Sequence, residues 1–378
     1  MSDLPATNLV MLTLVKPEGA LEVFFERRPM PQPRPHEVLV KVLTTPINPS
    51  DLGLLFGAAD MTTARADTRD GLPVITADIP PPGMRAMAGR LGEALPIGNE
   101  GCGLVVKAGD SPEAQALLGK TVALLGGEMY AEYRCLPVQM AMPLPDGTDP
   151  VDGASCFVNP LTSLSFAETM RMEGHSAIVH TAAASNLGQM LVKICAKDGI
   201  PLVNIVRSDA QVALLKGIGA QHVLNSGDAD FHDRLVDALV ETGATIGFDA
   251  IGGGKLAGQI LAAMEAAAVK RMTSYSRYGS DTFKQVYIYG ALDLGPTVLN
   301  RSFGFSWALS GFLLTPFMAK AGADVVARMR QRVVDELTMT FKSHYSHEIS
   351  LTDALNLDIA QAYNAKRTGE KYLIRPHG

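Results

Sequence analysis

The segment Ala177–Gly188, with the sequence AIVHTAAASNLG, carries residue types that could hold a phosphate group. Four mostly apolar residues predict a buried strand, and small residues then lead into a helical stretch that ends near Lys197. A helix that begins where a strand ends offers free N–H groups and a positive dipole to a pyrophosphate. The usual glycines of such a turn are mostly missing, with Ala183 and Ser185 at comparable places. The turn alone is a weak motif, so its interpretation as a dinucleotide-binding site depends on the motifs around it.

The end of the next predicted strand selects between dinucleotide cofactors. An acid about 20 residues beyond the turn binds the ribose of NAD, whereas a basic residue accommodates the 2′-phosphate of NADP. Here the strand LVNIV ends at Arg207, which is followed by Ser208, and an Arg fork beside a hydroxyl suits a phosphate. We therefore predict NADPH as the cofactor. Asp209 is interpreted as the N-cap of the following helix; the alternatives, that it reaches the ribose or that Arg207 is a solvated surface cation, stay open.

Length and composition limit the class of protein. At 378 residues the chain exceeds the size at which single cores usually stop growing, so two domains are expected. Hydrophobic residues make up 47% and charged residues 19%, yet no uninterrupted apolar run reaches the ~20 residues of a membrane span. A net charge of −6 without a basic cluster argues against nucleic-acid binding. The expected partner is a small-molecule substrate, without nucleic acid or membrane.

Cysteine usage and the first residues bear on the compartment. Cys102, Cys135, Cys156 and Cys195 are widely scattered in apolar or small-residue contexts, which favours reduced cysteines that act as small hydrophobes. The beginning of the chain, MSDLPATNLVMLT, lacks the basic region and apolar block of a secretory signal. We expect a cytoplasmic protein.

The residue composition and the pattern of apolar residues change along the chain. Residues 1–155 are rich in short Val/Leu runs broken by Pro and Gly, which predicts a β-rich domain. Residues 156–310 alternate apolar strands with amphipathic helices, the pattern of a doubly wound parallel sheet. Residues 311–378 are too few for a separate core and are predicted to complete the first domain. The segment 58–95 reads as irregular, and we interpret it as a lid over the substrate.

Eight short motifs, in a characteristic order, resemble the zinc-independent medium-chain dehydrogenase/reductase family, and in particular its quinone oxidoreductases and mitochondrial-type 2-enoyl thioester reductases. The motifs are INPSD at 47–51, PIGNEGCGLVVKAG at 96–109, GEMYAEY at 127–133, VNPLTS at 158–163, AAASNLGQ at 182–189, GA-x-HVLN at 219–225, FDAIGG at 248–253 and GEKYLI at 369–374. The resemblance implies an α/β chain with a GroES-like β-rich catalytic domain (1–155 and 311–378) and a Rossmann domain (156–310). It also implies that nicotinamide lies between the two domains.

The resemblance further implies roles for particular residues. Asn48 would hold the nicotinamide or the substrate carbonyl, and Thr162 would line the nicotinamide ribose pocket. The remaining residues would contact the cofactor: Ser185, Asn186, Leu187 and Gly188 at the pyrophosphate, Arg207 and Ser208 at the 2′-phosphate, Asn225, Asp249 and Ile251 at the adenine and ribose, Tyr289 and Gly290 at the nicotinamide, and Lys371 closing the site. Two structural alternatives stay open, since Asn48 precedes Pro49 in a turn and Asp249 could cap a helix.

No metal is expected. Zinc-dependent relatives place a cysteine near the INPSD motif and use Gly-His-Glu where this chain has Gly98-Asn99-Glu100, and Asn is a poor zinc ligand. The pair His344 and His347 has a suitable spacing but lacks a third ligand nearby.

One departure from the family bears on the substrate. Enoyl thioester reductases carry a catalytic tyrosine after INPSD, and Ala59 stands at its place here. A hydroquinone anion is readily protonated by water, so the sequence favours hydride transfer from NADPH to a quinone or an α,β-unsaturated carbonyl. The alternatives are a 2-enoyl thioester reductase and, from another class, a non-catalytic crystallin-like protein that binds NADPH. A homodimer is predicted, because the apolar stretch 301–309 lies where relatives extend their sheets across a two-fold axis.

Overall fold

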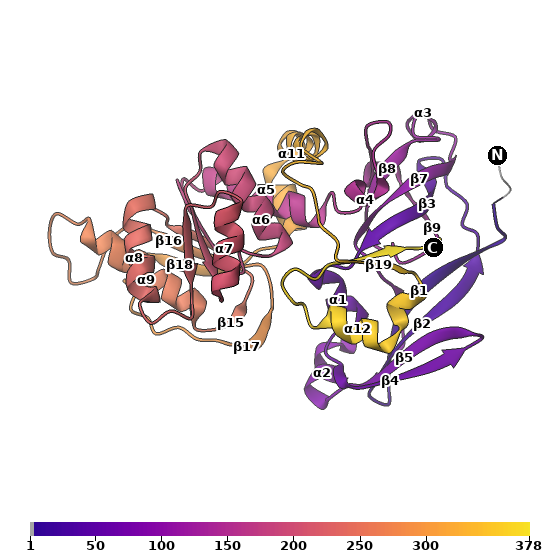
Figure 1. The fold of residues 1–378 in the computed structure, drawn as a ribbon, viewed down its shortest axis with the longest axis horizontal. Helices are drawn as coiled ribbons and strands as arrows, with labels where there is room; N and C mark the ends of the chain where they lie inside the picture. Colours follow the sequence, from indigo (N-terminus) through magenta and orange to yellow (C-terminus); the bar gives the residue numbers. More distant parts are fainter. Residues whose placement is uncertain (1–3) are drawn as a thin grey trace. The chain divides into compact units, whose positions relative to one another are not determined.

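The computed structural model describes residues 4–378, which form two compact units (Figure 1). The first comprises the described residues up to Val158 together with Val334–Gly378, and the second comprises Asn159–Val333. The boundary predicted at residue 310 lies inside β18 (Trp307–Gly311), a strand of the second unit, which continues through two further helices.

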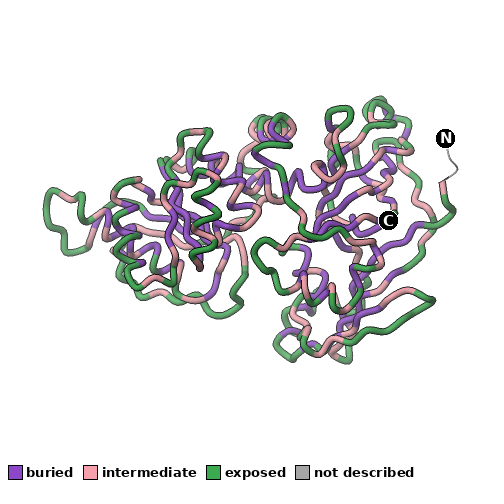
Figure 2. The backbone as a smooth tube through the Cα atoms, in the orientation of Figure 1, coloured by how far each residue is buried: buried purple, intermediate pink, exposed green. Residues whose placement is uncertain are grey.

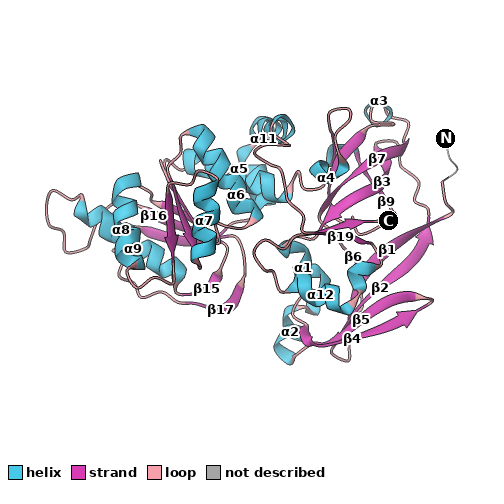
Figure 3. Ribbon diagram, viewed as in Figure 1, coloured by secondary structure: helices cyan, strands magenta, loops and turns pink. Residues whose placement is uncertain are grey.

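The first unit is built mainly from strands, as Figure 3 shows for its described residues. One sheet has the order β4-β5-β2-β1-β6 and the other has the order β10-β8-β7-β3-β20-β19, with β9 also paired to β3. The strands of the first sheet are β1 (Thr7–Lys16), β2 (Ala20–Pro29), β4 (Asp60–Arg69), β5 (Leu72–Asp78) and β6 (Ala94–Pro96). Those of the second are β3 (Glu37–Pro46), β7 (Glu100–Ala108), β8 (Thr121–Leu125), β9 (Tyr133–Pro137), β10 (Ala141–Pro143), β19 (His347–Ser350) and β20 (Tyr372–Arg375).

Short helices join these strands. They are α1 (Pro49–Leu55), α2 (Pro81–Ala86), α3 (Pro112–Gln115), α4 (Pro150–Gly153) and α12 (Leu357–Asn364), with 3-10 turns at Ala88–Arg90, Val138–Met140 and Asp353–Leu355. A buried core between α1, α12 and the strands includes Leu52, Leu55, Phe56 and Tyr363. The rings of Phe56 and Tyr363 stack with centroids 5.8 Å apart, so α1 and α12 are fixed to each other.

The prediction that residues 58–95 are irregular is wrong for most of that segment. β4 and β5 form an antiparallel hairpin, and β5 continues the sheet by pairing with β2, for example Ala77 with Leu21. The turn is Asp70-Gly71, both with positive φ (52° and 77°), and Asp-Gly is a strong two-residue hairpin signal that the polar sequence of β4 obscured. Its role as a lid stays a prediction.

The end of the chain belongs to the sheet of the first unit. β20 pairs antiparallel with β3, placing Ile374 opposite Thr45, and β19 lies parallel to β20 on the outer side. The tail thereby brings Lys371, one residue before β20, to the sheet that also contains β7.

The second unit has a parallel sheet of order β13-β12-β11-β14-β16-β18 within the described chain. Counted along the sequence this is the 3-2-1-4-5-6 order of the Rossmann fold. Its strands are β11 (Ile178–His180), β12 (Leu202–Val206), β13 (His222–Asn225), β14 (Ile246–Asp249), β16 (Lys284–Ile288) and β18, and a small sheet pairs β15 (Gly252–Gly254) with β17 (Asp293–Thr297). The predicted doubly wound sheet is confirmed.

Helices cover both faces of this sheet. The helices are α5 (Val158–Met172), α6 (Asn186–Asp198), α7 (Asp209–Gly217), α8 (Phe231–Thr242), α9 (Leu256–Lys270), α10 (Leu314–Ala321) and α11 (Ala323–Asp335). Val179, Val203 and Ile205 pack with α8 and α9 on one face. Residues of opposite parity, such as Ile178, pack with α5 and α6 on the other. Both faces of the strands are therefore buried (Figure 2), which explains their continuous apolar sequences.

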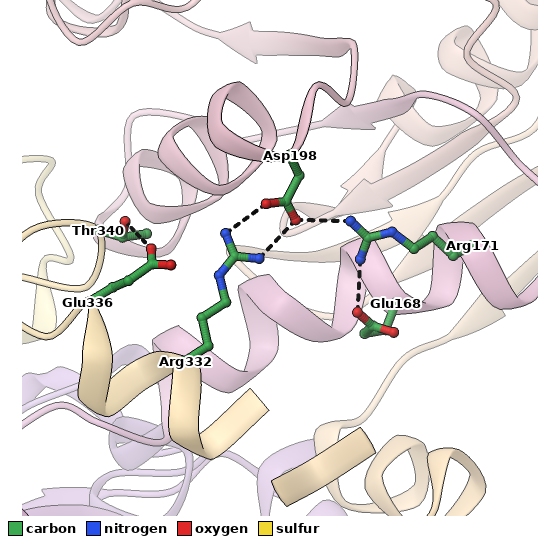
Figure 4. A network of polar contacts seen from close by, with 6 residues as sticks. All are labelled: Glu168, Arg171, Asp198, Arg332, Glu336 and Thr340. Atoms are coloured by element: carbon green, nitrogen blue, oxygen red, sulfur yellow. Dashed lines mark hydrogen bonds and ion pairs between the residues drawn. The ribbon is translucent and has the colours of Figure 1, made fainter. Parts of the chain in front are cut away.

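A network of charges ties α11 to the helices of the second unit (Figure 4). Asp198, at the end of α6, accepts two hydrogen bonds of 2.8 Å from Arg332 and one of 2.9 Å from Arg171, which also contacts Glu168. Burial alone would raise the pKa of Asp198, but the hydrogen bonds from the two arginines hold it below its ordinary value. The fork of Arg332 meets the carboxylate in a bidentate arrangement, which fixes the orientation of α11.

We expect Asp198→Asn to lower the free energy of unfolding of the second unit by about 1–3 kcal/mol, because it leaves two arginines without their shared anion. Trp307 is the single tryptophan of the sequence and packs against Phe303, so its fluorescence during urea unfolding reports on this unit. Asp237→Asn is the control, since its ion pair with Lys270 is exposed and contributes little. Equal midpoints for both variants would contradict the role given to Asp198.

Candidate functional site

The turn between β11 and α6 has the geometry of an anion cradle without its usual glycines. Ser185 is the N-cap of α6, and its Oγ accepts a 3.1 Å hydrogen bond from the Gly188 N–H. A Cβ on Gly188 would lie 2.1 Å from the carbonyl oxygen of Ala183, so the helix begins closer to the turn than any other residue allows. Ala182 adopts a positive φ of 48°, a conformation that favours glycine.

The cradle lies at the switch point of the sheet. β11 has β12 on one side and β14 on the other, and the strand order reverses there. The Ala183 N–H donates to Ile205 O of β12, and the Thr181 N–H donates to Phe248 O of β14. Asn186 and Leu187 form the first turn of α6, whose early N–H groups lack partners within the helix. The sites predicted at 185–188 thus share one helix terminus, which fits a pyrophosphate.

The residues predicted to select the cofactor directly follow β12. Arg207 is exposed directly after the strand, and its N–H donates to Gln211 Oε1. The prediction of Asp209 as the N-cap is wrong, because Ser208 caps α7 by accepting from the Gln211 N–H at 3.4 Å. Asp209 instead accepts a 3.0 Å hydrogen bond from Asn225 Nδ2, at the end of β13. The amide of Asn225 is therefore held in place by a carboxylate.

Asp249 has a structural place at the end of β14. Its buried carboxylate accepts hydrogen bonds from Thr181 Oγ1 at 2.6 Å and from the N–H groups of Ile251 and Gly252 at 3.0 Å. Two of these donors belong to the turn after β14 and the third follows β11, so Asp249 shapes the loop that presents Ile251 and ties it to the neighbouring strand. Asp249 caps no helix, because the next helix, α9, begins at Leu256, and its predicted contact with the adenine and ribose stays a prediction.

Tyr289 and Gly290 follow β16 beside this loop. A Cβ on Gly290 would lie 2.5 Å from Ala250 O, so the two loops meet backbone to backbone. The Tyr289 hydroxyl lies 2.8 Å from Nε2 of His180. Burial lowers the pKa of His180 to about 3, which keeps the imidazole neutral and agrees with its interpretation as the end of a buried strand.

Thr162 lies in α5, within the second unit. It is partly buried, and its carbonyl accepts the hydroxyl of Ser165. Its predicted role at the nicotinamide ribose stays a prediction, as do the cofactor roles of the residues above.

In the first unit, a buried carboxylate organises the residues around Asn48. Glu100, at the start of β7, is fully buried. Its Oε1 accepts from Asn48 Nδ2 at 2.8 Å and from Ser155 Oγ at 2.9 Å. Its Oε2 accepts from the N–H groups of Phe157 and Val158, both at 2.9 Å. The amide of Asn48 is thus oriented by Glu100, and Asn48 is more than a turn residue.

A second buried carboxylate holds the loop of Asn48. Asp51 accepts hydrogen bonds of 2.8 Å from the N–H groups of Asn48 and Asn99. Burial raises the pKa of Asp51 to about 7, although these N–H groups lower it. Asn99 is engaged here by its backbone, while its side chain donates to Ser50.

Lys371 reaches the same cluster from the tail. Its Nζ donates to Ser155 Oγ at 3.3 Å and lies 5.3 Å from the centre of the Tyr345 ring. Burial lowers the pKa of Lys371 to about 8, against the negative charges of Glu100 and Asp51, which raise it. The structure brings Asn48 and Lys371 together through Ser155 and Glu100.

The sequence did not single out Glu100, Asp51, Ser155 or Tyr345. The spacing Asn48-x-x-Asp51 after a strand is a capping-box signal and could have indicated Asp51. Ser155 and Tyr345 have no local motif, and only the pairing of β20 with β3 makes them neighbours of Lys371.

Some features are absent from the part of the chain that the structure describes. Residues 4–378 contain no group of three or more His, Cys, Asp or Glu side chains arranged to hold a metal ion. Over the same residues, no helix combines the length and apolar character needed to cross a membrane. All four cysteines are unpaired.

Comparisons with known proteins agree with this architecture. No family model matches the chain. Prostaglandin reductase-3 of Mus musculus is 26% identical over 290 residues, covering 74% of this chain and 73% of that protein. The mitochondrial enoyl-[acyl-carrier-protein] reductase of Caenorhabditis elegans is 25% identical over 240 residues, covering 62% of this chain and 61% of that protein. A crystal structure provisionally described as an NADPH:quinone reductase from Mesorhizobium loti is 28% identical, has a TM-score of 0.74, and covers 99% of this chain and 100% of that one.

A GroES-like β-rich unit and a Rossmann unit with an anion cradle at its switch point define a dinucleotide-binding α/β protein. The chain is similar over most of its length to zinc-independent medium-chain dehydrogenase/reductases that are named as prostaglandin, enoyl and quinone reductases. The resemblance seen in the eight motifs is confirmed.

We expect Glu100→Gln to open the segment at Phe157 and Val158. The amide would turn an NH₂ group toward two of the four donors that Glu100 accepts, which costs about 2–4 kcal/mol for a buried site. Hydrogen exchange at the Phe157 and Val158 amides should accelerate strongly. Glu26→Gln serves as the control, because the pair of Glu26 with Arg28 is exposed. Unchanged protection in Glu100→Gln would show that the carboxylate does not hold this segment.

Proposed function

We propose that the protein is a zinc-free, NADPH-dependent oxidoreductase that reduces a quinone or an α,β-unsaturated carbonyl compound. The observation that carries this is the cradle at Ser185–Gly188 with Arg207 at the end of the neighbouring strand. When bound, NADPH supplies a hydride. The names of the relatives, a prostaglandin reductase, an enoyl reductase and an NADPH:quinone reductase, support acceptors of this kind.

Some residues of the chain would bind the cofactor, and others would orient the nicotinamide or the substrate carbonyl. The N-terminus of α6 would hold the pyrophosphate, and Ser208 would donate its hydroxyl hydrogen to the 2′-phosphate, since its oxygen already accepts from Gln211. Asn48, with its carboxamide fixed by Glu100, would hold the nicotinamide amide or the substrate carbonyl. Thr162 and Tyr289 would line the nicotinamide site.

Quinone or enone reduction is placed ahead of two alternatives. Ala59 packs against the core of the first unit and carries no hydroxyl, so a 2-enoyl thioester reductase would need another proton donor. A non-catalytic NADPH-binding protein would keep the cradle and lack turnover. The four unpaired cysteines support the proposed cytoplasmic location.

The function is tested by NADPH oxidation with 1,4-benzoquinone, 9,10-phenanthrenequinone, an enone and crotonyl-CoA, side by side. Turnover with a quinone or the enone is expected. Tight NADPH binding without turnover of any acceptor would support the binding-only alternative, and rapid reduction of crotonyl-CoA alone would favour the thioester reductase.

Arg207→Glu should raise the dissociation constant of NADPH by about 10- to 100-fold more than that of NADH, because it places a carboxylate beside the 2′-phosphate. Dissociation constants are measured by cofactor fluorescence. Lys216→Glu makes the same charge change on the exposed side of α7 and should leave the NADPH/NADH ratio unchanged. Equal losses for both cofactors in Arg207→Glu would remove the basis for choosing NADPH.

We also propose a homodimer formed at the edge of the Rossmann sheet. β18 is the terminal strand, and large apolar side chains near it are exposed, including Phe305 (76%) and Leu313 (68%). Light scattering should give twice the 40.2 kDa mass of the chain. The double variant Phe305→Lys/Leu313→Lys should be monomeric, and a wild-type chain that elutes as a monomer would contradict the proposal.

A further inference from the structure

The hydroxyl of Tyr345 has an unusual environment in the first unit. It is enclosed by protein and has no hydrogen-bond partner among the described residues, whereas buried tyrosine hydroxyls are ordinarily bonded. The ring itself is partly exposed. An enclosed hydroxyl without a partner retains both a proton to give and an acceptor site to fill.

The groups around Tyr345 form a continuous polar chain. Lys371 Nζ lies 5.3 Å from the ring centre and donates to Ser155 Oγ at 3.3 Å. Ser155 in turn donates to Glu100 Oε1 at 2.9 Å, and the same oxygen accepts from Asn48 Nδ2 at 2.8 Å. One carboxylate therefore orients both the serine beside Lys371 and the amide proposed to hold the substrate carbonyl.

Two other buried tyrosines of this unit donate their hydroxyls to backbone carbonyls. The Tyr130 hydroxyl donates to Pro46 O at 3.2 Å, and the Tyr363 hydroxyl donates to Ala354 O at 2.8 Å. The ring of Tyr372 stacks on His347 with centroids 4.5 Å apart. Ala59 has no hydroxyl, and the enclosed Tyr345 hydroxyl donates its proton to none of the described residues.

We propose that Tyr345 is the catalytic proton donor of this protein, with Lys371 and Ser155 as positioning residues that restore its proton. This inference rests on the proposed function, since it assigns an acid to the same reaction. Relatives carry the catalytic tyrosine shortly after the INPSD motif, where this chain has Ala59. The proposal assigns the same role to Tyr345, which lies near the end of the given sequence.

The proposed step balances as follows. A hydride from NADPH forms a C–H bond at the β-carbon of an α,β-unsaturated carbonyl, and the π electrons move to give an enolate. The Tyr345 O–H bond breaks, its proton forms the new bond at the α-carbon, and the oxygen is left as tyrosinate. A proton from the Lys371 ammonium, which Ser155 positions, restores the phenol, and solvent reprotonates the lysine. The sum is one NADPH and one proton consumed per carbonyl compound reduced.

The charges that face this pair favour the roles assigned. Burial and the nearby charge of Glu100 raise the pKa of Tyr345 well above its ordinary value. The phenol therefore stays protonated between turnovers. The charge of Glu100 opposes tyrosinate, whereas Glu100 and Asp51 favour the ammonium form of Lys371. With a pKa of about 8, Lys371 holds a transferable proton near neutral pH.

The first test is Tyr345→Phe, assayed with an enone and with a quinone. Loss of a general acid should lower kcat for the enone by about 10²-fold or more. Quinone reduction should change by less than about 3-fold, because water protonates a hydroquinone anion. Tyr363→Phe is the matched control, since it removes another buried hydroxyl of this unit and should leave the enone-to-quinone ratio unchanged. NADPH affinity, measured by fluorescence, should be the same in all three proteins.

A second readout follows the proton rather than the rate. For reduction in D₂O, wild type should place solvent deuterium on one face of the α-carbon, and Tyr345→Phe should place it on both. Retained rate and single-face labelling in Tyr345→Phe would overturn the inference while leaving the proposed function intact. Wild-type turnover of quinones without any enone would also overturn the inference alone, whereas no turnover with any acceptor would contradict the proposed function itself.

A third readout needs no cofactor. In protein labelled with ¹³C at tyrosine Cζ, the resonance assigned through Tyr345→Phe should shift slightly with a midpoint near pH 8, as Lys371 loses its charge. Lys371→Met should abolish that shift, and Lys197→Met, in the second unit, should preserve it. If the pH-dependent shift of the Tyr345 resonance is the same in wild type and in Lys371→Met, the proposed coupling of the two residues is wrong.

Discussion

The carboxylate of Glu100 is the interaction on which the first unit's site depends. Four donors converge on its two oxygens: the Asn48 amide, the Ser155 hydroxyl and the N–H groups of Phe157 and Val158. A buried carboxylate is stable only when such partners replace water. Because the Glu100 carboxylate needs all four donors, it fixes three parts of the chain together: the loop before α1, the start of β7 and the segment that leads into α5. Asn48 is one hydrogen bond from this carboxylate, and Lys371 is two hydrogen bonds from it, through Ser155.

The second unit depends on a different constraint, the close approach of backbone to backbone. At Gly188 and Gly290 a Cβ would lie 2.1 Å and 2.5 Å from the carbonyl oxygens of Ala183 and Ala250. These glycines permit the contacts at the carboxyl ends of β11, β14 and β16. The other glycines of the usual turn are dispensable because Ala182 adopts the positive φ and Ser185 supplies the cap. The turn between β11 and α6 thus keeps its geometry although most of the glycines usual in a dinucleotide-binding turn are absent.

Sequence patterns predicted the Rossmann sheet well, because both of its faces are covered and its strands are continuous apolar runs. They failed at β4, whose exposed polar sequence hid a strand that only its pairing with β5 and the Asp-Gly turn define. They also mistook Asp209 for an N-cap, since Ser208 one position earlier is an equally good capping residue. Ser155, Tyr345 and Lys371 lie far apart in sequence, and no local pattern could have joined them.

The position of β20 has a consequence for how the chain folds. This strand occupies an interior place between β3 and β19, yet it lies far from its partner β3 in the sequence. The Rossmann unit is contiguous and can form as soon as residue 333 has left the ribosome, whereas its neighbour must wait for the final strand with the flank of β3 unpaired. The Rossmann unit is therefore expected to fold before the β-rich unit, and a truncation ahead of Lys371 would remove both a sheet strand and the lysine beside it.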